Sequence, residues 1–231
     1  MENLIFKAVL ALPGAKVNRM EYLSSNFRRY GMVERLNNET PVSVYGRDIV
    51  ERVAKSSINA HTFRTTIEST ACGVPGGIAM VGTLPTDMIQ FNYHIVVLAQ
   101  KLAYLYGWDN LFDENGNVDD ETYVKLSLFI GRMYGVQVAE DALKSISRCA
   151  AENLVKKLPK MALTKSLLYR TVREVAKHLG VKVTKDSFAK AVGKAIPFVG
   201  GAISGVMTYA SFRPMANRLN ESFKDSYGMV A

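Results

Sequence analysis

The sequence predicts an all-α protein: a compact multi-helix bundle with two glycine-rich, uncharged helical segments at its centre. Three observations support this prediction. Apolar residues recur at helical spacing along most of the 231 residues. Asn, Pro and Gly stand where helices begin and end. The alternation that marks a β-strand occurs only in fragments such as Val181–Val183, which are too short to build a sheet.

The first helix has a recognisable start and stop. Asn18 and Glu21 have the spacing of a capping box, in which the side chain of each residue accepts a hydrogen bond from a free backbone N–H. The helix should run to about Arg29 and end at Gly31, because glycine adopts the left-handed conformation that terminates helices.

Two longer helices should follow. The first covers Asp48–Thr70, and the glycines and proline after it interrupt the pattern. Its apolar positions at helical spacing are Ile49, Val53, Ala60, Phe63 and Ile67. The second is expected to begin with Pro85 in the first helical position and Asp87 in the first turn, where the helix dipole favours a carboxylate. It should run to Tyr106, and Gly107 should close it.

A polar loop is expected over Trp108–Asp120, followed by amphipathic helices to the end of the chain. The predicted helices cover about Asp119–Met133, Val138–Lys157, Leu163–Leu179, Lys185–Ala195 and Gly201–Tyr227. No stretch rich in Pro, Gly and Ser divides the chain, so we expect residues 1–231 to form a single domain.

Two segments of 18 residues, Ser69–Thr86 and Ala195–Phe212, carry no charge. Glycines four residues apart in each would let another backbone approach closely. These glycines are Gly73, Gly77, Gly201 and Gly205. Eighteen residues is the lower limit for a membrane span, but both segments contain proline, glycine and hydroxyl side chains. The preferred interpretation is a tightly packed pair of central helices, and the alternative is a hairpin that enters a bilayer after a conformational change.

The sequence favours a reducing compartment. Cys72 and Cys149 fit no metal or redox spacing, and the first residues lack the features of a secretory signal. We therefore expect a cytoplasmic protein, with a peripheral position at the inner face of the membrane as a further expectation.

Positive charge is concentrated in the second half of the chain. The net charge is +8, and residues 121–231 carry 18 basic and 8 acidic side chains. The basic residues near two predicted helices are Lys156, Lys157, Lys160, Lys165, Arg170, Arg173 and Lys177. A basic helix face opposite an apolar one is typical of a helix at a membrane surface. A nucleic acid would bind through the same charges, but no nucleic-acid-binding motif accompanies them in this sequence. A solvated helix surface explains them equally well.

Several runs of residues resemble the EcsC family, in the family's order and over most of the chain. The runs are Leu12–Arg19, Glu21–Leu23, Gly73–Met80, Pro85–Asp87, Ala99–Gly107 and Ile196–Gly201. The resemblance implies a helical domain associated with membranes and transport systems. It implies no catalytic residues. The last run is also similar to helical domains appended to membrane-acting GTPases, although no GTPase motif is present.

Motifs for common cofactors are absent. Neither phosphate-binding glycine motif, GxxxxGK[ST] or GxGxxG, occurs. An alignment of residues 113–117 to a calcium loop fails, because Val118 stands where the sharp turn needs glycine. His61, His94 and His178 form no zinc motif with the cysteines. The sequence therefore predicts no cofactor and no metal.

One group of polar residues is a candidate for chemistry. Asp87, Gln90 and His94 have the spacing of one helix face. A carboxylate and an imidazole on one face could act as acid and base or orient a ligand. The preferred interpretation is structural, with Asp87 at the helix start and His94 as a hydrogen-bonded, half-buried side chain.

The leading functional hypothesis is a non-enzymatic domain that docks on an anionic lipid surface or a membrane protein through Lys144–Lys194. One alternative is an enzyme or small-ligand binder with a cleft around Asp87 and His94. The other alternative is a nucleic-acid-binding protein.

Overall fold

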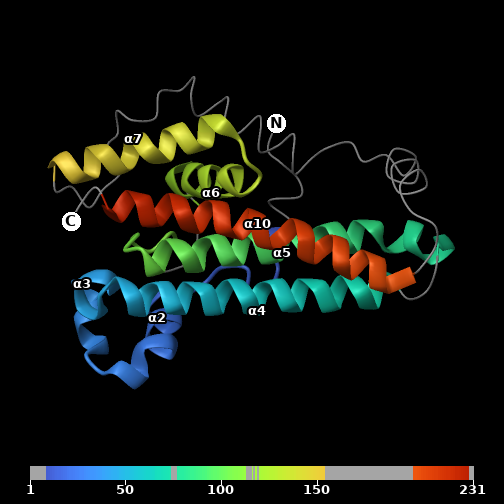
Figure 1. Ribbon diagram of the computed structural model, residues 1–231, viewed down its shortest axis with the longest axis horizontal. Coiled ribbons are helices and arrows are strands. Elements are labelled where there is room, and N and C mark those ends of the chain that lie inside the picture. Colours follow the sequence, from blue (N-terminus) through green and yellow to red (C-terminus); the bar gives the residue numbers. More distant parts are fainter. Residues whose placement is uncertain are drawn as a thin grey trace.

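A computed structural model describes residues 9–73, 77–112, 116, 118, 120–153 and 200–228. Within these ranges the secondary structure consists of seven α-helices and two 3₁₀ turns, with no strand (Figure 1). The predicted all-α class is confirmed. The predicted helices Leu163–Leu179 and Lys185–Ala195 lie outside the described ranges.

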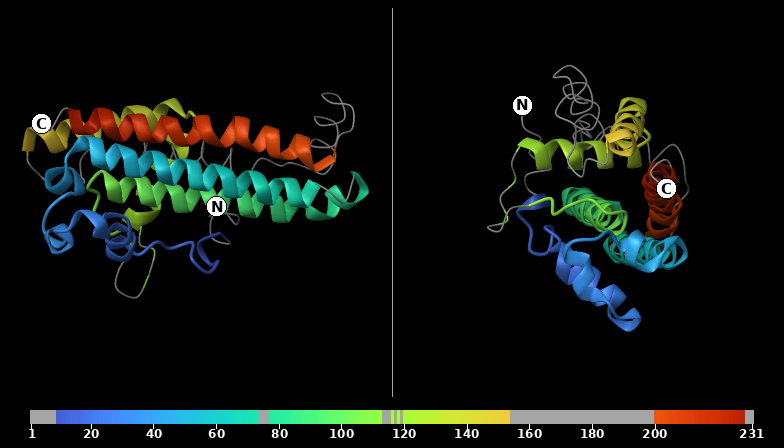
Figure 2. Two further views of the ribbon diagram at one scale, coloured as in Figure 1. Left: turned by 60° about the horizontal axis from the view of Figure 1, so that its bottom comes forward. Right: turned by 90° about the vertical axis from the view of Figure 1, so that its left-hand side faces the viewer.

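Three long helices run side by side along the molecule. They are α4 (Arg47–Gly73), α5 (Gly77–Leu105) and α10 (Gly200–Gly228). Helices α6 (Asp120–Met133) and α7 (Gln137–Asn153) lie on one side of them, and the N-terminal elements lie on the other (Figures 1 and 2). The N-terminal elements are α2 (Arg19–Phe27), η1 (Arg28–Tyr30), η2 (Val33–Asn37) and α3 (Pro41–Tyr45).

Helix α10 runs antiparallel to α4. Near the start of α4, Glu51 lies 3.1 Å from Lys224 of α10. Near its end, a Cβ on Gly205 would overlap Thr70 Oγ1 and lie 3.3 Å from the Thr66 carbonyl oxygen. The helices therefore approach closely where the sequence has glycine, as predicted for Gly205. Gly73, Gly77 and Gly201 are also helical, but their surroundings lie outside the described part.

The predicted N-cap at Asn18 is confirmed, which is one of the two hydrogen bonds of the expected capping box. Asn18 Oδ1 accepts a hydrogen bond of 2.9 Å from the backbone N–H of Glu21 at the start of α2. After α2 the chain continues through η1 and turns at Gly31, whose φ of 72° lies in the left-handed region.

A buried glutamine ties the segment before α2 to α5. Gln100 is fully buried, and its Oε1 accepts a 2.8 Å hydrogen bond from the Val17 N–H. Its Nε2 donates to the carbonyls of Ala15 and Val96, at 2.8 and 2.9 Å. The segments Leu12–Arg19 and Ala99–Gly107 are thus in direct contact, because backbone groups of one satisfy the amide of the other.

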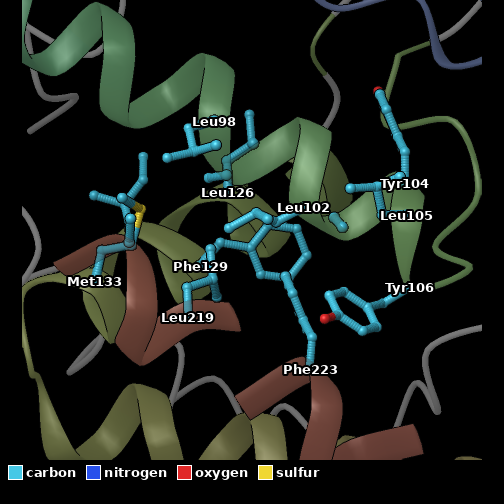
Figure 3. Packing of buried hydrophobic residues seen from close by; sticks show 14 of the residues in the cluster. Leu98, Leu102, Tyr104, Leu105, Tyr106, Leu126, Phe129, Met133, Leu219 and Phe223 are labelled. Atoms are coloured by element: carbon cyan, nitrogen blue, oxygen red, sulfur yellow. The ribbon is translucent and has the colours of Figure 1, made fainter. Parts of the chain in front are cut away.

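Aromatic side chains fill the core between α5, α6 and α10. The Phe129 ring lies edge-on to Trp108 and to Phe223, with centroid distances of 4.8 and 5.2 Å. Tyr106 packs against Phe223 at 5.9 Å, and leucines of α5 complete the cluster (Figure 3). Trp108 is therefore partly buried against the core, although it opens the predicted polar loop.

The prediction for the start of α5 was wrong. The helix begins at Gly77, so Pro85 and Asp87 lie in its third and fourth turns rather than in its first. Residues 77–84 are uncharged and mostly apolar, and they continue the helix toward its N-terminus. The φ of proline is compatible with a helix. Inside a helix, proline destabilises the structure because it lacks a backbone N–H and because its ring clashes with the carbonyl four residues earlier. Helix α10 likewise contains Pro214.

Candidate functional site

The three residues of the predicted polar face all lie on α5. Asp87 lies inside α5 with its side chain outside the described part, and Gln90 is half-buried on the same helix. His94 is buried, with 4% exposure. Its partners, His61 and Glu68, come from α4 instead. The predicted hydrogen bonding of His94 is confirmed, although the side chain is more deeply buried than expected.

Four side chains form a continuous hydrogen-bonded chain across α4 and α5. His94 Nε2 lies 2.8 Å from Glu68 Oε2, and the two histidine Nδ1 atoms lie 3.1 Å apart. His61 Nε2 lies 2.9 Å from Lys101 Nζ. We call Glu68, His94, His61 and Lys101 the histidine chain.

Helix geometry explains why these residues meet. His61 and Glu68 are seven residues apart on α4, and His94 and Lys101 are seven apart on α5. Seven residues make about two turns, so each pair shares a helix face. Helices α4 and α5 are joined by a short connection and pack against each other. The two polar pairs therefore meet along one line of contact between α4 and α5, which we call the seam.

The charge of Lys101 sets the direction of every hydrogen bond in the chain. An ammonium group only donates, so His61 Nε2 accepts and the ring proton of His61 is on Nδ1. That Nδ1–H donates to His94 Nδ1, which places the proton of His94 on Nε2. His94 Nε2–H then donates to the Glu68 carboxylate. Both histidines are neutral in this arrangement, and each ring nitrogen has a partner.

Burial and positive charge keep His61 neutral. Desolvation, then the positive charge of Lys101, and then His94 and Arg64 lower the pKa of His61 to about 2. Burial, followed by Arg64, also lowers the pKa of Lys101. The Lys101 ammonium lies 5.5 Å from the centroid of the Tyr22 ring, which supplies a cation–π contact at this end of the chain.

The histidine chain is poorly suited to a metal ion. With the ring proton of His61 on Nδ1 and Lys101 on Nε2, neither nitrogen of that ring is free to coordinate. In the part of the chain that the structure describes, no group of three or more His, Cys, Asp or Glu side chains is placed to hold a metal ion.

A second feature is a strip of exposed apolar side chains where α4 and α10 run together. Phe63 and Val206 are 66% and 68% exposed, and Ile67 and Tyr209 are about half exposed. Because Gly205 faces Thr66 and Thr70, helical geometry places these four residues on the same side of the antiparallel pair. We call them the apolar strip. Met207 is also exposed but points further from the contact between the helices.

A hollow of about 450 Å³ lies at the other end of the same face of α4. Its lining residues are Ser25, Asn26, Arg28, Arg29, Val53 and Ser56. Ser56 and Phe63 are seven residues apart, so the hollow and the apolar strip lie on one face of the helix. This face thus combines two guanidinium groups with exposed apolar surface.

The predicted contact residues of the basic region, Lys156–Lys177, lie outside the described ranges. Within those ranges no helix has the length and apolar character that crossing a membrane requires. Sequence reasoning missed Glu68 and Lys101 as partners of the histidines. The matching seven-residue spacings on two adjacent helices were the available signal.

Comparison of the chain with protein-family models, with curated proteins and with solved structures finds no match, so the resemblance to the EcsC family stays a prediction.

Proposed function

We propose that this protein is a peripheral helical domain that docks on an anionic membrane surface. The observation that carries the proposal is the apolar strip, Phe63, Ile67, Val206 and Tyr209, exposed on one side of α4 and α10. A water-exposed group of large apolar side chains in two neighbouring helices is typical of an interaction surface.

Charge complementarity favours a lipid surface as the partner. Arg28 and Arg29 line the hollow on the same face of α4 as Phe63, and Arg213 lies 5.7 Å from the Tyr209 ring centroid. Apolar and aromatic side chains next to guanidinium groups suit the boundary between acyl chains and anionic head groups. The basic region Lys144–Lys194 would add further attraction, since each cation near such a surface contributes about 1 kcal/mol.

The expected affinity is moderate and reversible. Complete burial of a large apolar side chain contributes roughly 1.5–3 kcal/mol, and the strip residues are about half to two-thirds exposed. Four such residues therefore contribute about 3–7 kcal/mol when they enter the interface. Electrostatic attraction must supply the remainder, so binding should weaken with added salt.

Co-sedimentation with liposomes tests the proposal. Full-length protein should bind anionic vesicles in low salt, bind less in moderate salt and fail to bind neutral vesicles. The double variant Phe63→Gln/Ile67→Gln should bind at least tenfold more weakly. Met32→Gln is the matched control, because Met32 has nearly the exposure of Ile67, 48% against 50%, but lies at the start of η2.

The basic region needs a separate variant. Replacing Lys156, Lys157, Lys160 and Arg173 by Glu should abolish the preference for anionic vesicles. Equal binding of the wild type to neutral and anionic vesicles, or unchanged binding by both multiple variants, would contradict the proposal. Preferential binding of a polynucleotide would instead favour the nucleic-acid alternative.

A further inference from the structure

We propose that His61 and His94 are a proton-binding site that controls the contact between α4 and α5. In the closed state the neutral pair completes the histidine chain. Uptake of a proton by the pair breaks this chain and separates the two helices at the seam. This inference concerns the packing of α4 on α5 and does not depend on membrane docking.

In the closed state, no ring nitrogen of His61 or His94 has a free lone pair that could accept another proton. His61 Nε2 accepts from Lys101 and His94 Nδ1 accepts from His61, while the other two ring nitrogens carry protons. A proton added to His61 Nε2 would face the Lys101 ammonium at 2.9 Å. A proton added to His94 Nδ1 would face the His61 N–H at 3.1 Å. Either addition turns a hydrogen bond into a repulsive contact between two donors.

Charged groups around the pair increase this repulsion. Lys101 of α5 and Arg64 of α4 both disfavour a positive His61. On α10, Arg213 is level with His61 in the antiparallel register and lies against Tyr209. Tyr22 of α2 donates to or accepts from Ser57, and its ring faces Lys101. Glu68 is the one carboxylate in the histidine chain, and it contacts His94 rather than His61.

The histidine chain connects the buried pair, His61 and His94, with solvent. The Glu68 side chain is 40% exposed, whereas His61 and His94 are almost completely buried. The histidine chain thus meets solvent at Glu68.

Acid should therefore open the seam. The pKa of His61 is held at about 2 in the closed state, whereas a solvated imidazole has a value of about 6.5. Between these values the open state binds more protons than the closed state, so lowering the pH favours opening. Each pH unit below about 6.5 shifts the ratio of closed to open molecules about tenfold.

Amide hydrogen exchange, corrected for intrinsic rates, tests the inference on the full chain at pH 7.5 and 5.5. Protection of residues 58–68 and 91–101 should fall about tenfold more than protection of residues 124–133 in α6. His61→Gln should abolish this difference. His178→Gln, which removes the third histidine of the sequence, should retain it. An equal fall in all three segments, or an unchanged difference in His61→Gln, would overturn the inference.

Imidazole NMR of the wild-type protein decides the question if His61→Gln does not fold. The ring signals of the pair should change only together with the loss of protection at the seam. A smooth titration of either ring between pH 7.5 and 5.5, with full protection of residues 58–68, would show that the pair accepts a proton without opening and would refute the proposal.

Discussion

Replacing Gln100 by methionine tests whether one buried amide holds the N-terminal segment on α5. Methionine is similar in length but forms none of the hydrogen bonds that Gln100 makes with Val17 and Ala15. The Val96 carbonyl retains its helical partner, so the buried Ala15 carbonyl and the partly buried Val17 N–H lose theirs. At roughly 1–3 kcal/mol for each of the two unpaired groups, the free energy of unfolding should fall by about 2–6 kcal/mol.

Urea denaturation measures this loss. With an m value of about 2 kcal/mol/M, the transition midpoint should fall by about 1–3 M. Gln137→Met is the matched control, because Gln137 is exposed and bonds only to Asp141 of its own helix. The control should change stability by less than about 0.5 kcal/mol. A loss below about 1 kcal/mol in Gln100→Met would show that water or rearranged backbone replaces the amide, which would refute the reasoning.

Three further substitutions test the packing of the helices. Gly205→Ala should destabilise the protein by about 1–3 kcal/mol, because the new methyl group overlaps Thr70 Oγ1, and Thr70→Ala should recover part of the loss in a double-mutant cycle. Tyr106→Phe should cost about 1 kcal/mol in urea denaturation through loss of the 3.0 Å hydrogen bond to Asn220. Lys144 and Arg132 lower the pKa of Glu140, so its contribution exists near neutral pH and is lost as the pH falls through that lowered pKa. Glu140→Gln should thus cost about 1 kcal/mol at pH 7 and less as the pH falls through the lowered pKa of Glu140, and a cost that does not fall with pH would contradict the assignment.

Local features were predictable from the sequence because their causes are local. The cap at Asn18 and the turn at Gly31 need only the conformational preferences of a few consecutive residues. The same local reasoning misplaced the start of α5, since Pro85 suits a first turn but is also found inside a helix whose neighbouring turns remain intact.

The site depends on contacts between helices that no local pattern specifies. The spacing of His94 to Gln90 indicated one helix face, but only the packing of α4 on α5 selects His61 and Glu68 as partners. Likewise, Phe63 and Ile67 follow the apolar periodicity of a helix, but α4 is packed through a different face that includes Val53, Ile58 and two buried threonines. The periodicity predicted the helix, and tertiary packing left these residues exposed.

The position of α10 has a consequence for the order in which the protein can fold during synthesis. Helix α10 follows every other described helix in the sequence, and it contacts α4, α5, α6 and α7. At 5–20 residues per second, the ribosome needs roughly 4–15 s to reach the end of α10 after finishing α7. During that interval the surfaces that later receive Phe212, Leu219 and Phe223 have no partner from α10. The nascent chain therefore presents an exposed apolar surface for several seconds, which is time enough for a chaperone to bind it before α10 completes the core.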